Sequence, residues 1–431
     1  MDKLIKSLSS DRVFATVEEV EMFAKERHAA KQSGGFERAG RDYHAYYWKL
    51  LLLLSLFYAL PASQFLIWQY RQGSTEGFDQ PGQECYFNFK CARQALGFYN
   101  FNNIVSNGMY VVVGCAFMLG VYLDRRGWQC GVGLDCDASL YYALGIAISC
   151  EGVFSAIYHI CPSALNFQFD TTFMVVSGGL FLMSVYAKRH HYIVPSAITA
   201  YGWMFVFIGL NMLSLSEWLP TALFWIACSL VVVFLNLRGS FVVYQPMSYK
   251  SLPAKLRDFY RRIRSCQGPR RRKRFAFFVV CNLLILALSL APLTYSQTKG
   301  VDPDSRSFPV FILGILVVSW IIYFFWYLFM KTVNTRRNPD EAVHLASIMF
   351  ISLTVVFWIL GVYFFKIPIS NKFLSWEESK TLNADCVLFD YFDTHDIWHF
   401  TSALALGGQL MSIYTVDRQL RYTQRNQIVV F

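Results

Sequence analysis

Two histidines near the C-terminal end of the chain have a spacing that suits metal binding. They occur in the run D-T-H-D-I-W-H-F, which places His395 and His399 four residues apart at the start of an apolar segment. Residues at this spacing lie on adjacent turns of one helix face, so both imidazoles can bind the same ion. The pair is also compatible with two histidines that hydrogen-bond backbone carbonyls near a helix end. Asp393 and Asp396 flank the pair, either as groups that fix the histidine tautomers or as solvated loop acids.

A second set of polar side chains interrupts an apolar segment nearer the middle of the chain. Glu151, Ser155 and His159 follow one another at four-residue intervals, and Asp170 comes eleven residues after the histidine. Four-residue steps return to the same helix face, so the first three residues share one stripe. Ionisable residues inside a membrane are costly and by default mark a functional site. Glu151 lies deepest, either supporting the site from behind or forming a protonated carboxyl bonded within the bundle.

Taken together, these residues predict a zinc centre. His159, His395 and His399 would be its ligands, because neutral imidazole suits zinc. Asp170 would complete the set as a ligand or, where water takes the fourth position, would orient that water or act as general base. Ser155 would hydrogen-bond an oxyanion or the water. Asp170 and Ser155 are therefore the predicted catalytic residues, and zinc is the predicted cofactor.

The segments that carry these residues are predicted membrane spans. The chain is 55% hydrophobic and 16% charged, whereas soluble chains carry about 25% charged residues. Its mean hydropathy is +0.34, and runs of about 20 apolar residues recur, each long enough to cross a hydrocarbon core. We predict an all-α polytopic membrane protein. Its ten spans would lie at approximately residues 49–68, 101–123, 140–160, 171–187, 193–213, 221–237, 275–293, 308–330, 342–365 and 397–413.

The net charge of +10 is explained largely by topology. Lys and Arg concentrate in the loops of one side, above all in the run R-R-R-K-R at 270–274, and the positive-inside rule places that side in the cytosol. Contact with anionic headgroups explains this run better than nucleic-acid binding, because no aromatic residues are interleaved. We predict a cytosolic segment 1–46 and a transmembrane domain 47–431 with a basic cytosolic loop 238–274. All the candidate ligands then fall at the outer level of the bilayer.

The eleven cysteines suggest one disulfide. Cys85 and Cys91 lie in C-Y-F-N-F-K-C, in the first predicted outer loop, where an oxidising compartment favours a short-loop disulfide between them. Cys386 lies in the last outer loop, and its partner is not identified by the sequence. Five others are predicted to be small buried apolar residues: Cys115, Cys150, Cys161, Cys228 and Cys281.

The motifs around the candidate ligands resemble those of known membrane proteins. S-x-x-x-H, the aspartate eleven residues on and H-x-x-x-H in the last span resemble the seven-helix hydrolase-like superfamily of alkaline ceramidases and progestin and adipoQ receptors. The runs C-Y-F-N-F-K-C, F-N-N-I-V-S-N, F-S-A-I-Y-H-I-C-P, N-F-Q-F-D and the closing I-V-V-F are more similar to the systemic-RNA-interference-defective transmembrane family. That family contains the animal double-stranded-RNA transporters and their cholesterol-linked relatives, and the similar motifs span residues 85–431.

The resemblance implies a homodimer of eleven-span chains containing a seven-helix hydrolase-like bundle. It also implies a zinc site formed by His159, His395, His399, Asp170 and Ser155. The family's extracellular β-rich domain and first span are expected to be absent here, which leaves ten spans and a cytosolic N-terminus.

Three functions follow as alternatives. The first, implied by the resemblance, is uptake of double-stranded RNA across a plasma or endolysosomal membrane. The second is zinc-dependent hydrolysis of a lipid amide or ester, in which substrate enters from the bilayer. The third is binding of membrane lipid, cholesterol included, for which an aromatic-rich bundle is permissive.

Overall fold

The computed structural model describes ten stretches of the chain. They are residues 46–76, 85–126, 138–164, 166–189, 197–214, 223–232, 252–265, 275–287 (except 278), 308–336 and 338–429, together with the isolated positions 18, 19, 22, 133, 134 and 234. Almost all of the predicted cytosolic segment 1–46 lies outside the described residues. So does most of the basic loop 238–274, apart from α10 (Leu252–Arg264) and Ser265.

The described residues form helices and no strand, which confirms an all-α polytopic membrane protein. Six helical segments are long and apolar enough to cross a membrane, and they match six of the ten predicted spans. They are α3 (Tyr47–Glu76), α4 (Phe101–Ser106) continued by α5 (Gly108–Asp124), α6 (Ser139–Tyr158), α7 (Phe167–Ala187), α12 (Phe308–Thr335) and α13 (Leu345–Phe365).

The other four predicted spans contain helices that are shorter or more polar. Apolar helical stretches of 10–17 residues, Ala197–Phe207, Leu223–Val232 and Phe275–Ala287, lie in the fifth, sixth and seventh predicted spans. The first of them is part of α8 (Ala197–Ser214). α15 (Thr394–Thr415) occupies the tenth predicted span, and its 22 residues include histidines, hydroxyls and a glutamine. The total of ten spans therefore stays a prediction.

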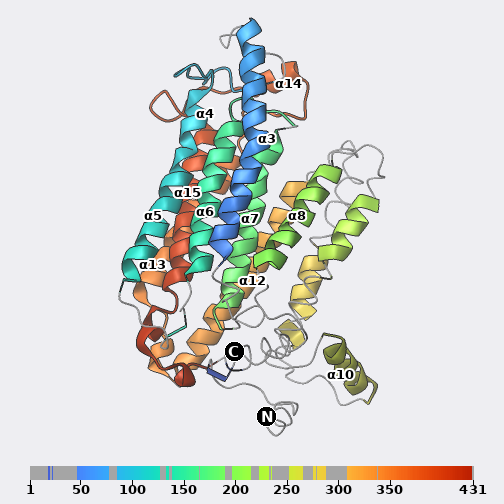
Figure 1. The fold of residues 1–431 in the computed structure, drawn as a ribbon, viewed down its shortest axis with the longest axis vertical. Coiled ribbons are helices and arrows are strands. Elements are labelled where there is room, and N and C mark those ends of the chain that lie inside the picture. The colour runs from blue at the N-terminus through green and yellow to red at the C-terminus, as the bar shows by residue number, and fades with distance from the viewer. Residues whose placement is uncertain are drawn as a thin grey trace.

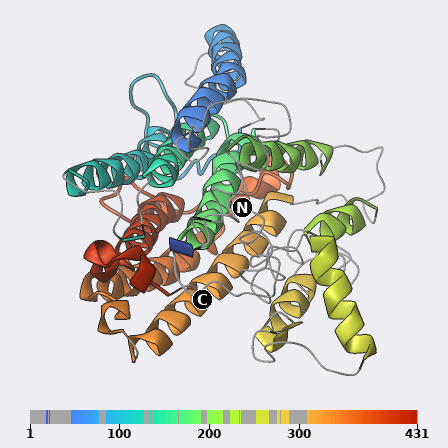
Figure 2. The same cartoon turned by 60° about the horizontal axis from the view of Figure 1, so that its bottom comes forward.

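The helices pack side by side along the long axis of the molecule (Figure 1). α6 contacts α3, α5 and α7, while α15 contacts α13 and α5, and α12 lies against α7 (Figure 2). Of the most apolar 18 residues, 56% are buried in α6 and 67% in α7, compared with 17% in α3 and α13. The helices that carry the predicted ligands are thus interior helices, and the outer helices present their apolar side chains to lipid.

α5 and α6 approach each other closely through glycine. A Cβ atom built on Gly114 would lie 2.3 Å from Ser149 Oγ and 2.5 Å from the carbonyl oxygen of Gly145. Small residues of this kind let two helix backbones come together, which is a principal source of stability between helices in a membrane. The contact holds α6, and therefore its polar stripe, against α5.

One end of the bundle contains a cluster of buried charges, and we call it the inner end because the predicted topology puts it on the cytosolic side. Arg189 donates two hydrogen bonds to Glu341, of 2.9 and 2.7 Å. Lys331 lies 3.1 Å from Asp417 and 3.4 Å from Glu341, and Lys188 lies 3.7 Å from Asp417. All five side chains are buried. The cluster ties the end of α7 to α12, to the 3-10 turn η1 (Pro339–Glu341) and to the segment after α15.

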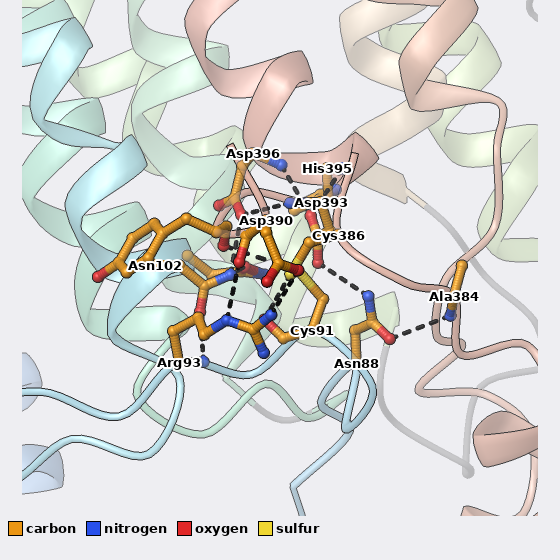
Figure 3. The surroundings of a disulfide bond; sticks show 12 residues. Asn88, Cys91, Arg93, Asn102, Ala384, Cys386, Asp390, Asp393, His395 and Asp396 are labelled. Carbon is orange, nitrogen blue, oxygen red and sulfur yellow. Dashed lines mark hydrogen bonds and ion pairs between the residues drawn. A yellow bond between two sulfur atoms is a disulfide. The ribbon is translucent and has the colours of Figure 1, made fainter. Parts of the chain in front are cut away.

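The opposite, outer end carries two disulfides, and they correct the predicted pairing of Cys85 with Cys91. Cys85 is bonded to Cys161 just after α6, and Cys91 is bonded to Cys386 (Figure 3). The short segment 85–91 bridges two other outer segments: Tyr86 N donates to Pro162 O at 2.9 Å, and the far end faces residues 384–392. Its two cysteines therefore meet different partners. Cys161 is buried as predicted, but it is cross-linked.

Candidate metal centre

The structure brings three histidines from two helices together at the outer end. His159 caps the C-terminus of α6, and His395 and His399 lie on the first two turns of α15. Their rings have centroids 4.5–5.1 Å apart, and one ligand atom from each lies within 4.8 Å of the other two. Among the described residues this is the one group of three or more metal-ligating side chains at such a spacing.

The three imidazoles fit a zinc ion. Both ring nitrogens of His159 are buried and have no hydrogen-bond partner in the described chain. A buried polar atom without a partner is costly, and a cation bound by one of the nitrogens would remove that cost. Zinc binds imidazole nitrogen at about 2.0–2.1 Å, so two ligands of one ion lie about 3–4 Å apart. The observed upper limit of 4.8 Å is close to this range.

Asp170 and Ser155, the predicted catalytic residues, lie against each other beside this group. Ser155 precedes His159 by one turn of α6, and Asp170 is in the first turn of α7. The Ser155 hydroxyl donates a hydrogen bond to Asp170 Oδ1, and both side chains are buried. The carboxylate is paired with this serine and is not one of the three clustered ligand atoms. Its service as a zinc ligand stays a prediction.

Asp393 and Asp396 hold the start of α15, and in the described structure neither carboxylate hydrogen-bonds a ring nitrogen of His395 or His399. Asp393 is the N-cap residue and accepts hydrogen bonds from the backbone N–H of His395 and Asp396, while Asp396 Oδ2 accepts from the backbone N–H of Asp393. Asn88 donates to Asp393 Oδ2 at 3.2 Å, and Asn102 donates to Asp396 Oδ2 at 3.0 Å (Figure 3). Both acids are fully buried. They are therefore neither tautomer-fixing groups nor solvated loop acids: they fix the position of the helix that carries two histidines.

Ser106 is a site residue that the sequence analysis missed. Its hydroxyl lies 2.8 Å from His399 Nδ1 and donates to the carbonyl of Asn103 at 3.0 Å. When the serine proton is directed at this carbonyl, Nδ1 of His399 carries a proton and donates to the serine oxygen. Nε2 of His399 is then left as the acceptor that a metal requires. The signal in the sequence was the polar run N-N-I-V-S-N in an otherwise apolar segment.

Lys372 is a second missed residue, from the segment between α13 and α14 (Trp376–Thr381). Its ammonium group lies 3.0 Å from the centre of the Phe167 ring and donates to the Tyr158 hydroxyl at 3.1 Å. It therefore lies over the turn that joins α6 to α7, beside His159. Burial lowers the pKa of Lys372 to about 8, and the nearby Asp170 opposes that shift. This arrangement places a cationic group at the outer rim of the site.

Glu151 occupies the position that the four-residue stripe predicted, two turns below His159 on α6. It is 2% exposed, and neither of its carboxylate oxygens has a hydrogen-bond partner in the described part of the chain. Glu151 is not a member of the three-histidine cluster.

The fold and the site together define a polytopic α-helical membrane protein with a buried three-histidine cluster near one end of its bundle. The family model described as dsRNA-gated channel SID-1 matches residues 4–431. The chain therefore belongs to the SID-1 RNA-channel family, which confirms the resemblance inferred from its motifs.

Curated relatives agree with this assignment. The chain is 34% identical over 410 residues to SID1 transmembrane family member 1 of Mus musculus and of Homo sapiens, which covers 91% of this chain and 47% of each relative. It is 30% identical over 404 residues to cholesterol uptake protein 1 of Caenorhabditis elegans, covering 88% of this chain and 50% of that relative. The chain thus spans about half the length of the curated relatives that it matches.

Proposed function

We propose that this chain is the membrane-embedded part of a protein that takes up double-stranded RNA, and that its three clustered histidines hold zinc. The match of the dsRNA-gated channel model to residues 4–431 supports the first statement. The buried, otherwise unpartnered imidazole of His159 beside His395 and His399 supports the second. Uptake would occur across the plasma membrane or an endolysosomal membrane.

In this proposal His159, His395 and His399 bind the ion, and Asp170, which lies outside their cluster, is the candidate fourth ligand or the base that orients a bound water. When bound, zinc would supply a Lewis acid that lowers the pKa of coordinated water. Ser106 sets the tautomer of His399, and the capped start of α15 fixes the direction of both of its histidines. Two disulfides hold the segments on either side of these helices, with Cys161 two residues after His159 and Cys386 nine residues before His395.

Zinc-dependent lipid hydrolysis is the second candidate, and the pair formed by Ser155 and Asp170 favours it. A buried carboxylate next to the metal would accept a proton from an attacking water, and the serine would hold that carboxylate in place. Lys372 at the rim would attract the oxyanion or the headgroup of a substrate arriving from the bilayer. A metal with a purely structural function needs neither a proton acceptor nor a cation at its rim.

Metal analysis of the purified chain combined with two activity assays tests both candidates. The unmodified chain should carry about one zinc ion per polypeptide, and the double variant His395→Ala/His399→Ala should carry none. His344→Ala is the matched control, because His344 caps α13 and lies outside the cluster. Absence of zinc from unmodified protein purified without chelator contradicts the zinc proposal.

The activity assays then separate the functions. Cells that express the double variant are tested for uptake of labelled duplex RNA. If uptake is lost although the variant reaches the membrane normally, zinc is necessary for transport. Retained uptake with loss of lipid amide or ester hydrolysis assigns the metal to the hydrolase. Asp170→Asn should keep the fold and remove hydrolysis while sparing any purely structural contribution of zinc.

We also propose that the chain is a homodimer and that it binds membrane sterol. Support for the second point comes from the name of a relative, cholesterol uptake protein 1. Photo-cross-linking with a sterol probe in the presence of excess cholesterol, and mass measurement of the purified particle, test the two points separately.

A further inference from the structure

α10 has the sequence pattern of an amphipathic helix. Five of its thirteen residues are basic and one is acidic in L-P-A-K-L-R-D-F-Y-R-R-I-R. With about 100° between successive residues, Leu256, Phe259, Tyr260 and Ile263 fall within one arc of about 100°. Every charged residue lies outside that arc. The helix therefore has one apolar face and one strongly basic face.

The apolar face of α10 is open along most of its length. Leu256 is 42% exposed, Tyr260 is 63% exposed and Ile263 is 51% exposed, at positions i, i+4 and i+7. Phe259, at the edge of the arc, is half-buried and lies 5.5 Å from the ring of Phe275. A contiguous apolar stripe exposed on a helix marks a surface that another apolar phase covers.

The position of α10 indicates that the apolar phase covering its stripe is the lipid bilayer. Figure 1 shows the helix beside the inner end of the bundle, outside the packed helices. In the predicted topology it belongs to the cytosolic loop between the sixth and seventh spans, so bilayer lies within reach of it. Cytosolic leaflets are rich in anionic lipids, which attract basic residues close to the surface. A stripe of Leu, Tyr and Ile bordered by arginines matches this surface in both polarity and charge.

We propose that α10 is an interfacial helix that docks on the anionic cytosolic leaflet. Leu256, Tyr260 and Ile263 enter the boundary between headgroups and acyl chains, and Arg257 and Arg264, which border the apolar arc on one side, contact lipid phosphates. The helix ties the long loop between two spans to the membrane surface. It does so without the zinc centre, so the proposal stands or falls independently of the proposed function.

Hydrogen exchange of the full chain in lipid nanodiscs tests this docking. Amides of residues 252–264 should exchange at least about tenfold more slowly in discs with about one-third phosphatidylserine than in phosphatidylcholine discs. The double variant Leu256→Gln/Ile263→Gln should lose this protection. The matched control, Leu374→Gln/Val387→Gln, removes similar exposed apolar surface at the outer end and should keep it.

The charge requirement is tested with Arg257→Gln/Arg264→Gln. Each basic residue near an anionic surface strengthens binding by about fivefold, so the double variant should bind about 25-fold more weakly. In phosphatidylserine discs this loss should remove most or all of the exchange protection of α10. An unchanged bundle, shown by the same melting temperature and elution volume, makes these comparisons valid.

Three outcomes overturn the proposal. In the first, α10 is protected equally in phosphatidylserine and phosphatidylcholine discs, and the Leu256→Gln/Ile263→Gln variant keeps the same protection. This result would show that the rest of the protein, and not the lipid, holds the helix. A second is fast exchange in every disc. The third is protection that appears in phosphatidylcholine discs only when duplex RNA is added, which would assign the basic face to nucleic acid.

Discussion

Replacing Asp417 with Asn should destabilise the bundle more than any single polar substitution at its surface. The carboxylate of Asp417 accepts a hydrogen bond from Tyr327 at 2.6 Å and lies 3.1 Å from Lys331, 3.4 Å from Arg189 and 3.7 Å from Lys188. The three cations carry a total charge of +3, and the two acids of the cluster, Asp417 and Glu341, carry a total charge of −2. The substitution leaves one acid, Glu341, from this set to face three buried cations.

The size of the loss in unfolding free energy follows from the burial of these charges. At an effective dielectric constant of about 20, each contact at 3–4 Å is worth about 4–5 kcal/mol of attraction, and most of that offsets the desolvation of the charges. When one partner is removed, the remaining charges stay buried and desolvated without it. Substitutions of this kind lower the free energy of unfolding by about 3–5 kcal/mol. For a chain of 431 residues the melting temperature should fall by about 3–6 °C.

Thermal unfolding in detergent, followed with a thiol-reactive dye, measures the effect because Cys228 and Cys281 are buried in the folded chain and react only when it unfolds. Cys115, which is exposed, is expected to react before the transition and to add a constant background. Asp124→Asn is the matched control. Asp124 also lies at the inner end and pairs with Arg421 at 3.2 Å, but it is partly exposed. Its loss should cost no more than about 1 kcal/mol. If both variants melt within a degree or two of each other, the buried cluster does not stabilise the fold and the reasoning is refuted.

Three further predictions concern other parts of the chain. Gly114→Ala should destabilise by about 1–3 kcal/mol through overpacking, whereas Gly120→Ala, on the same helix with open space around it, should be neutral or slightly stabilising in the same melting assay. Ser106→Ala should weaken zinc binding by His399 and its neighbours by about 10–100-fold in chelator competition, and Ser106→Thr, which keeps the hydroxyl, should restore it. Burial alone would raise the pKa of Asp417, but the adjacent cations hold that pKa well below its usual range. Its contribution to stability should therefore be complete above about pH 4, including pH 5, and should be lost progressively as the pH falls further, with a smaller loss in Asp417→Asn.

The sequence was sufficient for the membrane class and for six of the spans because apolar run length is a local property. It was also sufficient to select His159, His395 and His399, since ionisable residues stand out where almost everything else is apolar. α15 shows the limit of hydropathy. Its polar residues face the interior of the bundle, so the helix is less apolar than its neighbours. The four-residue spacing of its histidines identified it as a site helix.

Contacts between distant segments could not be predicted in the same way. Ser106 and His399 are 293 positions apart, and the disulfide between Cys91 and Cys386 closes a separation of 295. The predicted bond between Cys85 and Cys91 relied on closeness in sequence. Which cysteines meet is decided by where the segment 85–91 crosses the outer end of the bundle, and that depends on packing. Lys372 gave no local signal either, because lysines are ordinary in loops.

The two ends of the bundle are mechanically connected through the helices that carry the site. The first turn of α7 holds Asp170, and Lys188 and Arg189 follow the helix. The first turn of α15 holds His395, and Asp417 lies just beyond its end. Each helix is about 32 Å long, and a slip of one residue along its axis is about 1.5 Å. The inner ion cluster sets the axial register of α7 against the end of α15. A slip of that size would separate the carboxylate from the histidines by more than half the length of a metal–ligand bond. The geometry of the outer site is therefore determined partly by charges at the other side of the membrane.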